Sequence, residues 1–233
     1  MHLVVMTGAG ISADSGVRTF RDSDGLWEGQ RPEDVATPEA WARDPALVWR
    51  FYQERRAQLA TVNPNPAHTA LAEAADRLAC RGDDLTLVTQ NVDDLHERAG
   101  STAIHMHGEL AVLRCEQCGN KERGLDRVQA DAFLNCASCN HQLRPDIVWF
   151  GEVPFHLEQI ETALLGCSHF LAIGTSGHVY PAASMLQIAR ERGAKTYVQA
   201  LELPSNADAR DAFTAGRAAQ IVPELLTSIT EAR

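Results

Sequence analysis

The stretch that decides the fold is HLVVMTGAGISADSG, which spans residues 2–16. Its apolar start is the kind of short run that forms a buried strand. The next six residues, GAGISA at 8–13, fit the pattern G-x-G-x-x-A, in which glycines permit a tight turn and a close approach of the backbone to a pyrophosphate. A helix opening there would offer free N–H groups to a phosphate. The stretch therefore predicts a strand and a dinucleotide-binding turn at the start of the chain.

Short apolar runs alternate with longer helical patterns through the rest of the chain, which indicates a parallel sheet covered by helices. The expected strands are 2–7, 85–90, 103–106, 169–174 and 195–200, with a further short strand at 219–222. The expected helices are 45–61, 66–80, 155–165, 181–192 and 223–231. The predicted fold class is therefore α/β, with a Rossmann-like parallel sheet.

The composition of the 233 residues is that of an ordinary globular protein, with 45% hydrophobic and 22% charged residues. A formal net charge of −10 argues against direct nucleic-acid binding, which needs a basic surface. The start of the chain lacks the basic region of a signal peptide, and no stretch approaches the roughly 20 apolar residues that span a bilayer. We expect a cytoplasmic protein without a membrane or nucleic-acid partner.

Four of the six cysteines form two C-x-x-C pairs, Cys115 with Cys118 and Cys136 with Cys139, separated by 17 residues. Four thiolates with this spacing suit one tetrahedral zinc ion, and an all-cysteine site is closed to water, which is typical of a structural ion. A nucleic-acid-binding zinc ribbon is the alternative. The basic and acidic residues around the cysteines balance, so the sequence favours the structural role.

Two segments interrupt the alternation of strands and helices. Residues 28–60 are helical in pattern with no strand, and residues 109–144 are short, cysteine-bearing and irregular. We therefore expect these two segments to form a small helical and zinc-binding domain. The remaining segments, 1–27, 61–108 and 145–233, are expected to form the Rossmann-like, nucleotide-binding domain.

Polar side chains gather where an expected strand ends. Gln90, Asn91 and Asp93 directly follow the strand at 85–90. Ligands of open parallel sheets bind at the carboxyl ends of the strands, so these three side chains are candidates for a binding site. The segment GTSGHVYPAA, residues 174–183, is a second turn between a strand and a helix at that edge.

A general base is expected among the histidines at the end of the strand predicted at 103–106. His105 and His107 are predicted on one face of this strand, and an imidazole with a pKa near neutral suits proton transfer. His96 and His178 are the competing candidates. We favour His107 because a strand end, the adjacent Gly108 and the start of the cysteine-bearing segment coincide there.

Taken together, these motifs resemble the sirtuins, which are NAD-dependent protein-lysine deacylases. The resemblance extends from residue 2 to about residue 198 and includes the paired C-x-x-C motifs in their expected order. The other matching motifs are GAGISADSGVRTFR (8–21), TQNVDDLHERAG (89–100), HMHGEL (105–110), RPDIVWFGE (144–152) and GTSGHVYPAA (174–183). The resemblance implies NAD and one structural zinc ion as cofactors. It also implies acyl-lysine proteins or peptides as substrates, bound between a large and a small domain.

The resemblance also implies roles for individual residues. His107 would act as the general base with Asn91 beside it, and Phe20 and Arg21 would lie on a loop that closes over NAD. The implied NAD site comprises Gly8, Ala9, Gly10, Ile11, Asp14, Thr19, Phe20, Arg21, Trp27, Gln90, Asn91, Asp93, Gly174, Thr175, Ser176 and Ala218. The implied peptide site comprises Val148, Phe150, Gly151, Glu152, Gly177 and Val179, with segments 148–152 and 177–180 flanking the peptide as strands.

Tyr52 and Arg55 lie three residues apart, so on a helix they project from one face. The segments FYQER (51–55) and DVATP (34–38) resemble the class III sirtuins, whose known members remove succinyl, malonyl and glutaryl groups. That resemblance implies that Tyr52 and Arg55 bind an acidic acyl group, in a pocket widened by the small Ala36. The products would be nicotinamide and O-acyl-ADP-ribose, from acetyl as well as acidic acyl substrates.

The sequence departs from the sirtuin pattern after the strand at 195–200. Ala200 stands where the family usually has an asparagine that contacts adenosine, which predicts a weaker contact at 200–202. Three other activities remain open from the sequence. They are NAD-dependent protein ADP-ribosylation, hydride transfer by a zinc-stabilised dehydrogenase, and binding of NAD without release of nicotinamide. An ordinary dehydrogenase would need an acidic residue at the end of a second strand, which the polar stretch VRTFRDSDGLWEGQ does not supply.

Overall fold

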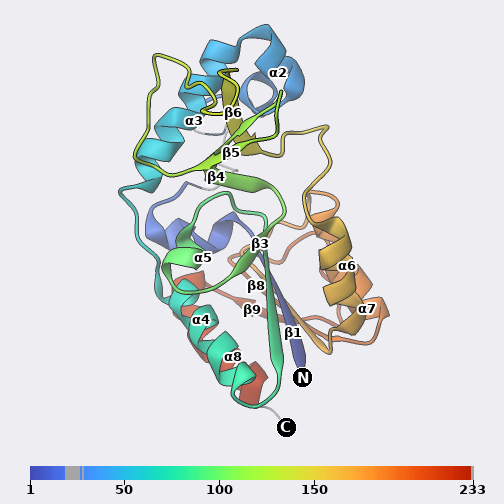
Figure 1. The fold of residues 1–233 in the computed structure, drawn as a ribbon. Helices are drawn as coiled ribbons and strands as arrows, with labels where there is room; N and C mark the ends of the chain where they lie inside the picture. The colour runs from blue at the N-terminus through green and yellow to red at the C-terminus, as the bar shows by residue number, and fades with distance from the viewer. Residues whose placement is uncertain (19–26, 28, 232–233) are drawn as a thin grey trace.

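The computed structural model describes residues 1–18, 27 and 29–231, and its main feature is a six-stranded parallel sheet (Figure 1). The strands are β1 (His2–Thr7), β2 (Asp84–Thr89), β3 (Ala103–His105), β7 (His169–Ile173), β8 (Lys195–Ala200) and β9 (Ala212–Ala215), in the order β3-β2-β1-β7-β8-β9. Counted along the chain within this sheet, the order is 3-2-1-4-5-6, as in a Rossmann fold. Thr7 pairs with Thr89 on one side and with Ile173 on the other, so the carboxyl ends of β1, β2 and β7 lie side by side.

Helices cover both faces of this sheet (Figure 1). One face carries α4 (Pro66–Ala79) and α8 (Ala218–Glu231), and the other carries α6 (Leu157–Gly166) and α7 (Ala182–Glu191). Strand β1 shows why both faces are buried. Leu3 and Val5 pack toward α4 and α8, whereas Val4 and Met6 pack toward α6 and α7. A strand buried on both faces reads as a continuous apolar run, as the sequence of β1 does.

A smaller antiparallel sheet lies beyond the carboxyl ends of the large one (Figure 1). Its strands are β4 (Gly108–Cys115), β5 (Lys121–Arg123) and β6 (Leu143–Ile147), in the order β5-β4-β6. Helices α1 (Pro32–Val35), α2 (Pro38–Arg43) and α3 (Pro45–Leu59) pack beside it. Trp49 of α3 packs in one apolar cluster with Cys115 and Cys136, so this helix leans against the cysteine-bearing segment.

The structure confirms the predicted α/β fold class and most of the predicted elements. Strands β1 and β8 begin and end where the sequence predicts. The expected strand at 219–222 is wrong, because these residues belong to helix α8. Val222, Leu226 and Ile229 recur at helical spacing and are all buried on one face, which favours helix over strand. Pro223 lies inside the helix rather than at its start.

Other parts of the structure lie outside the sequence-based expectations. Strand β9, at the edge of the sheet, is largely exposed and lacks the apolar pattern of a buried strand. The segment 109–144, expected to be irregular, contains most of β4 and all of β5. The turn after β1 forms two short 3-10 helices, Ala9–Ile11 and Ala13–Ser15, instead of opening a long helix. Among the described residues, no helix combines the length and the apolar character needed to cross a bilayer.

Candidate active site and cysteine cluster

The strand order reverses between β1 and β7, and the turns that follow these two strands touch. The amide of Gly10 donates to the Gly174 oxygen over 3.0 Å. A Cβ on Gly10 would lie 2.6 Å from the Gly174 Cα, and a Cβ on Gly174 would lie 2.6 Å from the Ile11 nitrogen. Gly174 also has a φ of 61°, a conformation that favours glycine. Contact between two backbones therefore requires glycine here, and the reversal point is where ligands of such sheets bind.

A buried polar group lies beside these turns, at the end of β2. Asn91 donates through Nδ2 to the Gly8 oxygen over 3.2 Å and to Ser12 Oγ over 3.1 Å. Ser12 in turn donates to Asp93 Oδ2 over 2.9 Å. Burial raises the pKa of Asp93, while the hydrogen bonds from Ser12 and the Leu95 amide oppose that shift. Asn91 and Asp93, both predicted, thus meet through Ser12.

Ser12 is a residue that the sequence analysis did not single out. Its side chain is fully buried, and it connects the turn after β1 to the end of β2. His68 of α4 lies behind it, with Nε2 3.5 Å from Ser12 Oγ, and burial lowers the pKa of His68 to about 4. The available signal was the position of Ser12 within the glycine-rich turn, because a hydroxyl there faces the ends of the neighbouring strands.

Two histidines hold successive carbonyl groups in the loop after β2. His107 Nδ1 lies 3.0 Å from the Gln90 oxygen, and His105 Nδ1 lies 3.2 Å from the Asn91 oxygen. A carbonyl oxygen only accepts, so each Nδ1 carries the hydrogen. The neutral His107 ring therefore has its lone pair on Nε2, where a general base needs it. Burial lowers the pKa of His107, and its hydrogen bond to Gln90 opposes the shift, which favours this neutral form near neutral pH.

The other histidines are engaged differently. His105 Nε2 lies 3.0 Å from Glu97 Oε1, so both of its nitrogens have partners. His96 is fully buried, with Nε2 3.0 Å from Thr7 Oγ1, and burial lowers its pKa to about 3. His178 is exposed on the turn after β7. Within the described part of the chain, His107 is thus the histidine at this strand end with no hydrogen bond to its second nitrogen.

The remaining predicted NAD-site residues are only partly brought together. Asp14 faces the start of α8, where it accepts from Arg217 over 2.8 Å and from the Ala219 amide over 3.3 Å, next to Ala218. Ile11 is fully buried in the core, so only its backbone lies at the turn. Predicted residues in the turns themselves are Gly8, Ala9, Gly10, Gly174, Thr175 and Ser176. The predicted Thr19, Phe20 and Arg21 lie outside the described residues.

The predicted acyl-binding residues form a second group around α3. Tyr52 is fully buried and packs in one cluster with Ala36 and Trp149. The Trp149 indole Nε1 donates to Tyr52 Oη over 3.0 Å, and the Phe150 amide donates to the Ala36 oxygen over 3.0 Å. These bonds join the segment around Ala36 to the motif VWFGE (148–152). Trp27, which the sequence predicts at the NAD site, packs edge-on against Tyr52, with ring centroids 5.9 Å apart.

Arg55 occupies the rim of this group rather than its centre. Its NH1 group donates to the Phe51 oxygen over 2.5 Å and to Glu54 Oε2 over 3.2 Å. The guanidinium carbon lies 3.8 Å from the centre of the Phe51 ring, a cation–π contact. Glu54 is exposed, so its pairing with Arg55 is the kind of surface contact that exchanges readily with other anions.

The segments expected to flank a peptide as strands are loops in the structure. Residues 148–152 and 177–180 belong to no strand, because neither has a neighbouring strand with which to form a hydrogen-bonded ladder. The Val148 amide donates to the His107 oxygen over 2.9 Å, which ties the first loop to the histidine site. Phe150 remains 47% exposed. The predicted peptide-site residues are Val148, Phe150, Gly151, Glu152, Gly177 and Val179.

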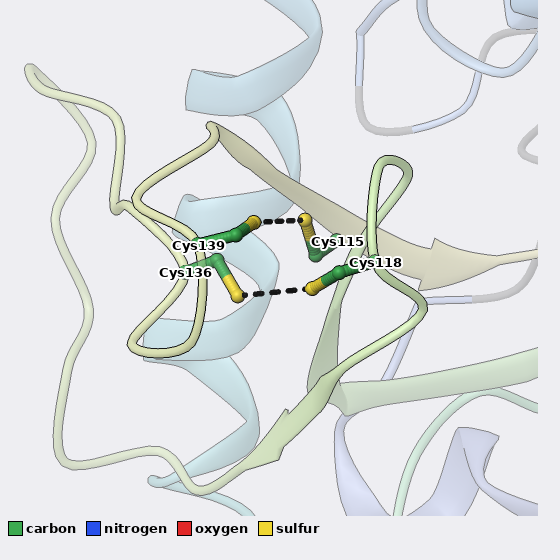
Figure 2. A group of neighbouring side chains, drawn as sticks. All are labelled: Cys115, Cys118, Cys136 and Cys139. Atoms are coloured by element: carbon green, nitrogen blue, oxygen red, sulfur yellow. Dashed lines mark hydrogen bonds between the residues drawn. The ribbon is translucent and has the colours of Figure 1, made fainter.

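The four cysteines of the C-x-x-C pairs come together at one end of the small sheet (Figure 2). Their sulfur atoms all lie within 4.8 Å of one another. Cys115 Sγ is 3.4 Å from Cys139 Sγ, and Cys118 Sγ is 3.6 Å from Cys136 Sγ. Zinc–sulfur bonds of about 2.3 Å place the corners of a tetrahedron roughly 3.8 Å apart, so the cluster fits one structural zinc ion.

Equivalent turns carry the two cysteine pairs. The Gly119 amide donates to the Cys115 oxygen over 3.0 Å, and the Asn140 amide donates to the Cys136 oxygen over 2.9 Å. Gly119 and Asn140 have φ values of 73° and 59°, in the region that glycine and asparagine tolerate best. The sequences CEQCGN and CASCNH therefore form matching turns that present two sulfur atoms each.

Comparison with known proteins agrees with this geometry. The Sir2 family matches residues 8–181. An "NAD-dependent protein deacylase" of Yersinia pseudotuberculosis is 51% identical over 228 residues, covering 96% of this chain and 81% of the relative. The protein of the same name from Pasteurella multocida is 49% identical and covers 97% of each chain.

Solved structures of Sir2 proteins share the fold. A Sir2 homologue in complex with NAD is 39% identical, with a TM-score of 0.88, and the match covers 98% of this chain and 89% of the homologue. A complex of Sir2 with a p53 peptide and NAD is 27% identical, with a TM-score of 0.82, over 99% of this chain and 94% of that one. The family match, the relatives and the shared fold thus confirm the resemblance found in the sequence, and the chain belongs to the Sir2 family.

Proposed function

We propose that this chain is an NAD-dependent protein-lysine deacylase. The observation that carries the proposal is His107, held through Nδ1 by the Gln90 carbonyl next to the buried Asn91–Ser12–Asp93 group. This site lies where the strand order of a Rossmann-like sheet reverses, which is where such sheets bind nucleotides. The names of the relatives, NAD-dependent protein deacylases, support the same activity.

In the proposed mechanism, residues at the ends of different strands have different functions. NAD bound at these strand ends would supply an electrophilic ribose carbon, with nicotinamide as the leaving group. His107 Nε2 takes a proton from a ribose hydroxyl, because Nδ1 is already committed to the Gln90 oxygen. Asn91 is fixed by Gly8 and Ser12, and it orients the sugar and the incoming acyl group. The turns that meet at Gly10 and Gly174 bring backbone amides to the phosphates.

The α3 group supports a preference for acidic acyl groups, the second part of the proposal. Tyr52 and Arg55 would bind the carboxylate of a succinyl or malonyl group, and Ala36 would leave room for it. A phenol and a guanidinium are both donors, and hydrogen bonds between charged partners are the stronger kind. Because Tyr52 is fully buried and the Trp27 ring packs on it, we infer that the Trp27 ring moves when an acyl chain enters.

The remaining parts of the proposal concern the frame of the site. Zinc held by the four cysteines would be structural, since all four corners of its coordination shell are protein ligands. We propose the small domain as segments 28–60 and 109–144, with the other segments forming the NAD-binding domain. Peptides would bind between them along residues 148–152 and 177–180. Given bacterial relatives and no helix that could span a membrane in the described residues, we propose a cytoplasmic location.

One experiment tests the proposal directly. Purified protein is incubated with NAD and a panel of peptides carrying acetyl-, succinyl-, malonyl- or unmodified lysine, and nicotinamide and deacylated peptide are quantified together. We expect one nicotinamide released for each acyl group removed, with the acidic acyl peptides consumed faster than the acetyl peptide. Nicotinamide release with ADP-ribose attached to protein would indicate ADP-ribosylation instead. Absence of nicotinamide release with every peptide would overturn the proposed activity.

A further inference from the structure

Trp149 makes a hydrogen bond that bears on how Tyr52 meets a ligand. The indole Nε1 can only donate, and it donates to Tyr52 Oη over 3.0 Å. The phenol therefore accepts from Trp149 and keeps its own hydrogen for another partner. Within residues 1–18, 27 and 29–231, no acceptor for that hydrogen is found. Burial raises the pKa of Tyr52, so the phenol retains this hydrogen throughout the neutral range.

We propose that Trp149 is a positioning residue that makes Tyr52 a donor dedicated to the carboxylate of an acidic acyl group. This inference rests on the proposed deacylase function and adds a specificity determinant to it. If Trp149 did not donate, the Tyr52 hydroxyl oxygen would lack this donor, and no hydrogen bond from the indole would fix the direction of its hydrogen. With the indole in place, the remaining interaction of Tyr52 is a donation, which suits a carboxylate and not a methyl group.

The surroundings of Trp149 hold its ring in this position. The Trp149 amide donates to Glu152 Oε2 over 2.9 Å. The Arg144 guanidinium carbon lies 3.4 Å from the centre of the Trp149 ring. Arg144 is itself nearly fully buried and bonds to Glu152 over 2.9 Å and to Glu116 over 3.1 Å. Two side chains and the backbone thus fix the direction in which the indole donates.

The contacts from Arg144 through Trp149 to Tyr52 also make the Tyr52 hydroxyl a stronger hydrogen-bond donor. A cation over an indole face draws electron density from the ring, so the N–H group becomes a better donor. Donation into Tyr52 Oη then makes the phenol O–H a better donor in turn, since hydrogen bonds in a chain polarise one another. Glu152 and Glu116 neutralise Arg144 in part, and so they moderate this effect without reversing the direction of donation.

The alternative to a positioning role is that the Trp149 side chain only packs against its neighbours. It is one of several large rings in this cluster, with Trp41 5.8 Å away and Tyr52 6.3 Å away between centroids. Packing would affect all substrates alike, because acetyl and succinyl peptides enter the same site. Positioning would affect acidic acyl groups selectively, and only while the Tyr52 hydroxyl is present. The packing role and the positioning role therefore predict different ratios of succinyl to acetyl activity.

The test is a double-mutant cycle with Trp149→Phe and Tyr52→Phe, read out as kcat/KM for succinyl-lysine and acetyl-lysine peptides. Phenylalanine keeps an aromatic face for Arg144 and removes the N–H donor together with part of the ring, and the Tyr52→Phe background separates the two losses. We expect Trp149→Phe to lower the ratio of succinyl to acetyl activity about two- to tenfold, the value of one oriented hydrogen bond. In the Tyr52→Phe background the same change should leave that ratio unaltered. Trp41→Phe, in the same aromatic cluster, is the matched control and should not alter the ratio.

Each outcome decides the proposal. An unaltered ratio in Trp149→Phe, or an equal fall with and without the Tyr52 hydroxyl, would show that Trp149 only packs. A wild-type protein that deacetylates but shows no preference for succinyl-lysine would also overturn the inference, while leaving the deacylase function intact. If Trp149→Phe does not fold, judged by its thermal transition, the indole is replaced site-specifically by benzothiophene. That ring keeps the shape and lacks the N–H group, and the same criteria apply to it.

Discussion

Two groups of residues face the proposed catalytic centre, and they are held in place by different means. The strand-end group of Ser12, Asn91, Asp93 and His107 is held by a polar hydrogen-bond network, which links Asn91, Ser12 and Asp93 and includes the oxygens of Gly8 and Gln90. The α3 group of Ala36, Tyr52, Trp149 and Arg55 is held mainly by apolar and aromatic packing, with a hydrogen bond between Tyr52 and Trp149, 97 residues apart. The polar network suits chemistry common to all substrates, whereas a packed aromatic pocket can vary with the acyl group. The difference predicts that rate and selectivity are separable.

The largest expected effect is on the strand-end group, through His107→Tyr. We expect the loss of deacylation by a factor of about 10² to 10⁴ for acetyl and succinyl peptides alike, because a general base contributes that much. The measurement is the rate of peptide deacylation at saturating NAD. Far-UV circular dichroism and zinc content should match those of the unaltered protein. A variant that retains activity, or loses it for one acyl group only, would remove His107 from the role of base.

The next effect is on the α3 group, through Arg55→Met. Methionine keeps the aliphatic length and removes the charge, so we expect the kcat/KM for succinyl-lysine to fall about ten- to hundredfold. The acetyl-lysine activity should survive, because the methyl group of an acetyl substrate has no charge or acceptor with which a guanidinium could pair. Arg50→Met, an exposed arginine on the same helix, is the matched control. Equal loss of both activities would show that Arg55 supports the site in general and does not select the acyl group.

The same contrast explains what the sequence could reveal. The strand-end group was predictable because β1 and β2 are short apolar runs followed directly by polar residues or glycine, and a parallel sheet brings such ends together. The contact of Gly10 with Gly174 was not predictable as such, although both glycines were. Their spacing indicates a turn but not which other backbone the turn touches. Ser12 was missed for a similar reason, since its partners Asn91 and Asp93 come from another strand end.

The α3 group shows where sequence patterns stop. Tyr52 and Arg55 share a helix but differ in depth, with the phenol fully buried and the guanidinium partly exposed against the Phe51 ring. Helical spacing predicts that two side chains share a face, but it does not predict how deeply each of them is buried. The Trp149 contact depends on how a loop after β6 folds back onto α3, which no local pattern encodes. Strand β9 and the start of α8 were misjudged because an exposed edge strand and a proline inside a helix both weaken the usual signals.

A third prediction concerns the cysteine cluster, which supports only one of the two groups. Helix α3 leans on this segment, with the Trp49 indole donating to the Gln129 oxygen over 2.7 Å and Arg56 to the Gly124 oxygen over 2.6 Å. We therefore expect Cys139→Ser, or removal of zinc by a chelator, to lower peptide deacylation about tenfold, because a structural zinc site supplies folding energy to the segment around it.

The control for this prediction is NAD affinity, measured by calorimetry. The affinity of Cys139→Ser should stay within about threefold of that of the unaltered protein, because the strand-end group lies on the large sheet. Cys80→Ser changes an exposed cysteine at the end of α4 and should affect neither quantity. A parallel loss of NAD binding and deacylation in Cys139→Ser would mean that the two groups are not independent, and the contrast between them would fail.

The smallest expected effect is the dependence of kcat/KM on pH, which tests the role of His107 as a base. A base acts when unprotonated, and burial lowers the pKa of His107 below the ordinary value of about 6.5. The neutral form therefore predominates already at about pH 6.5, so kcat/KM for the acetyl peptide should change less than about twofold between about pH 6.5 and 7.5. Activity should fall only as the pH drops further and the ring takes up a proton. An acidic limb centred at or above about pH 7 would contradict a partly buried, neutral His107, and it would point to a group with a raised pKa.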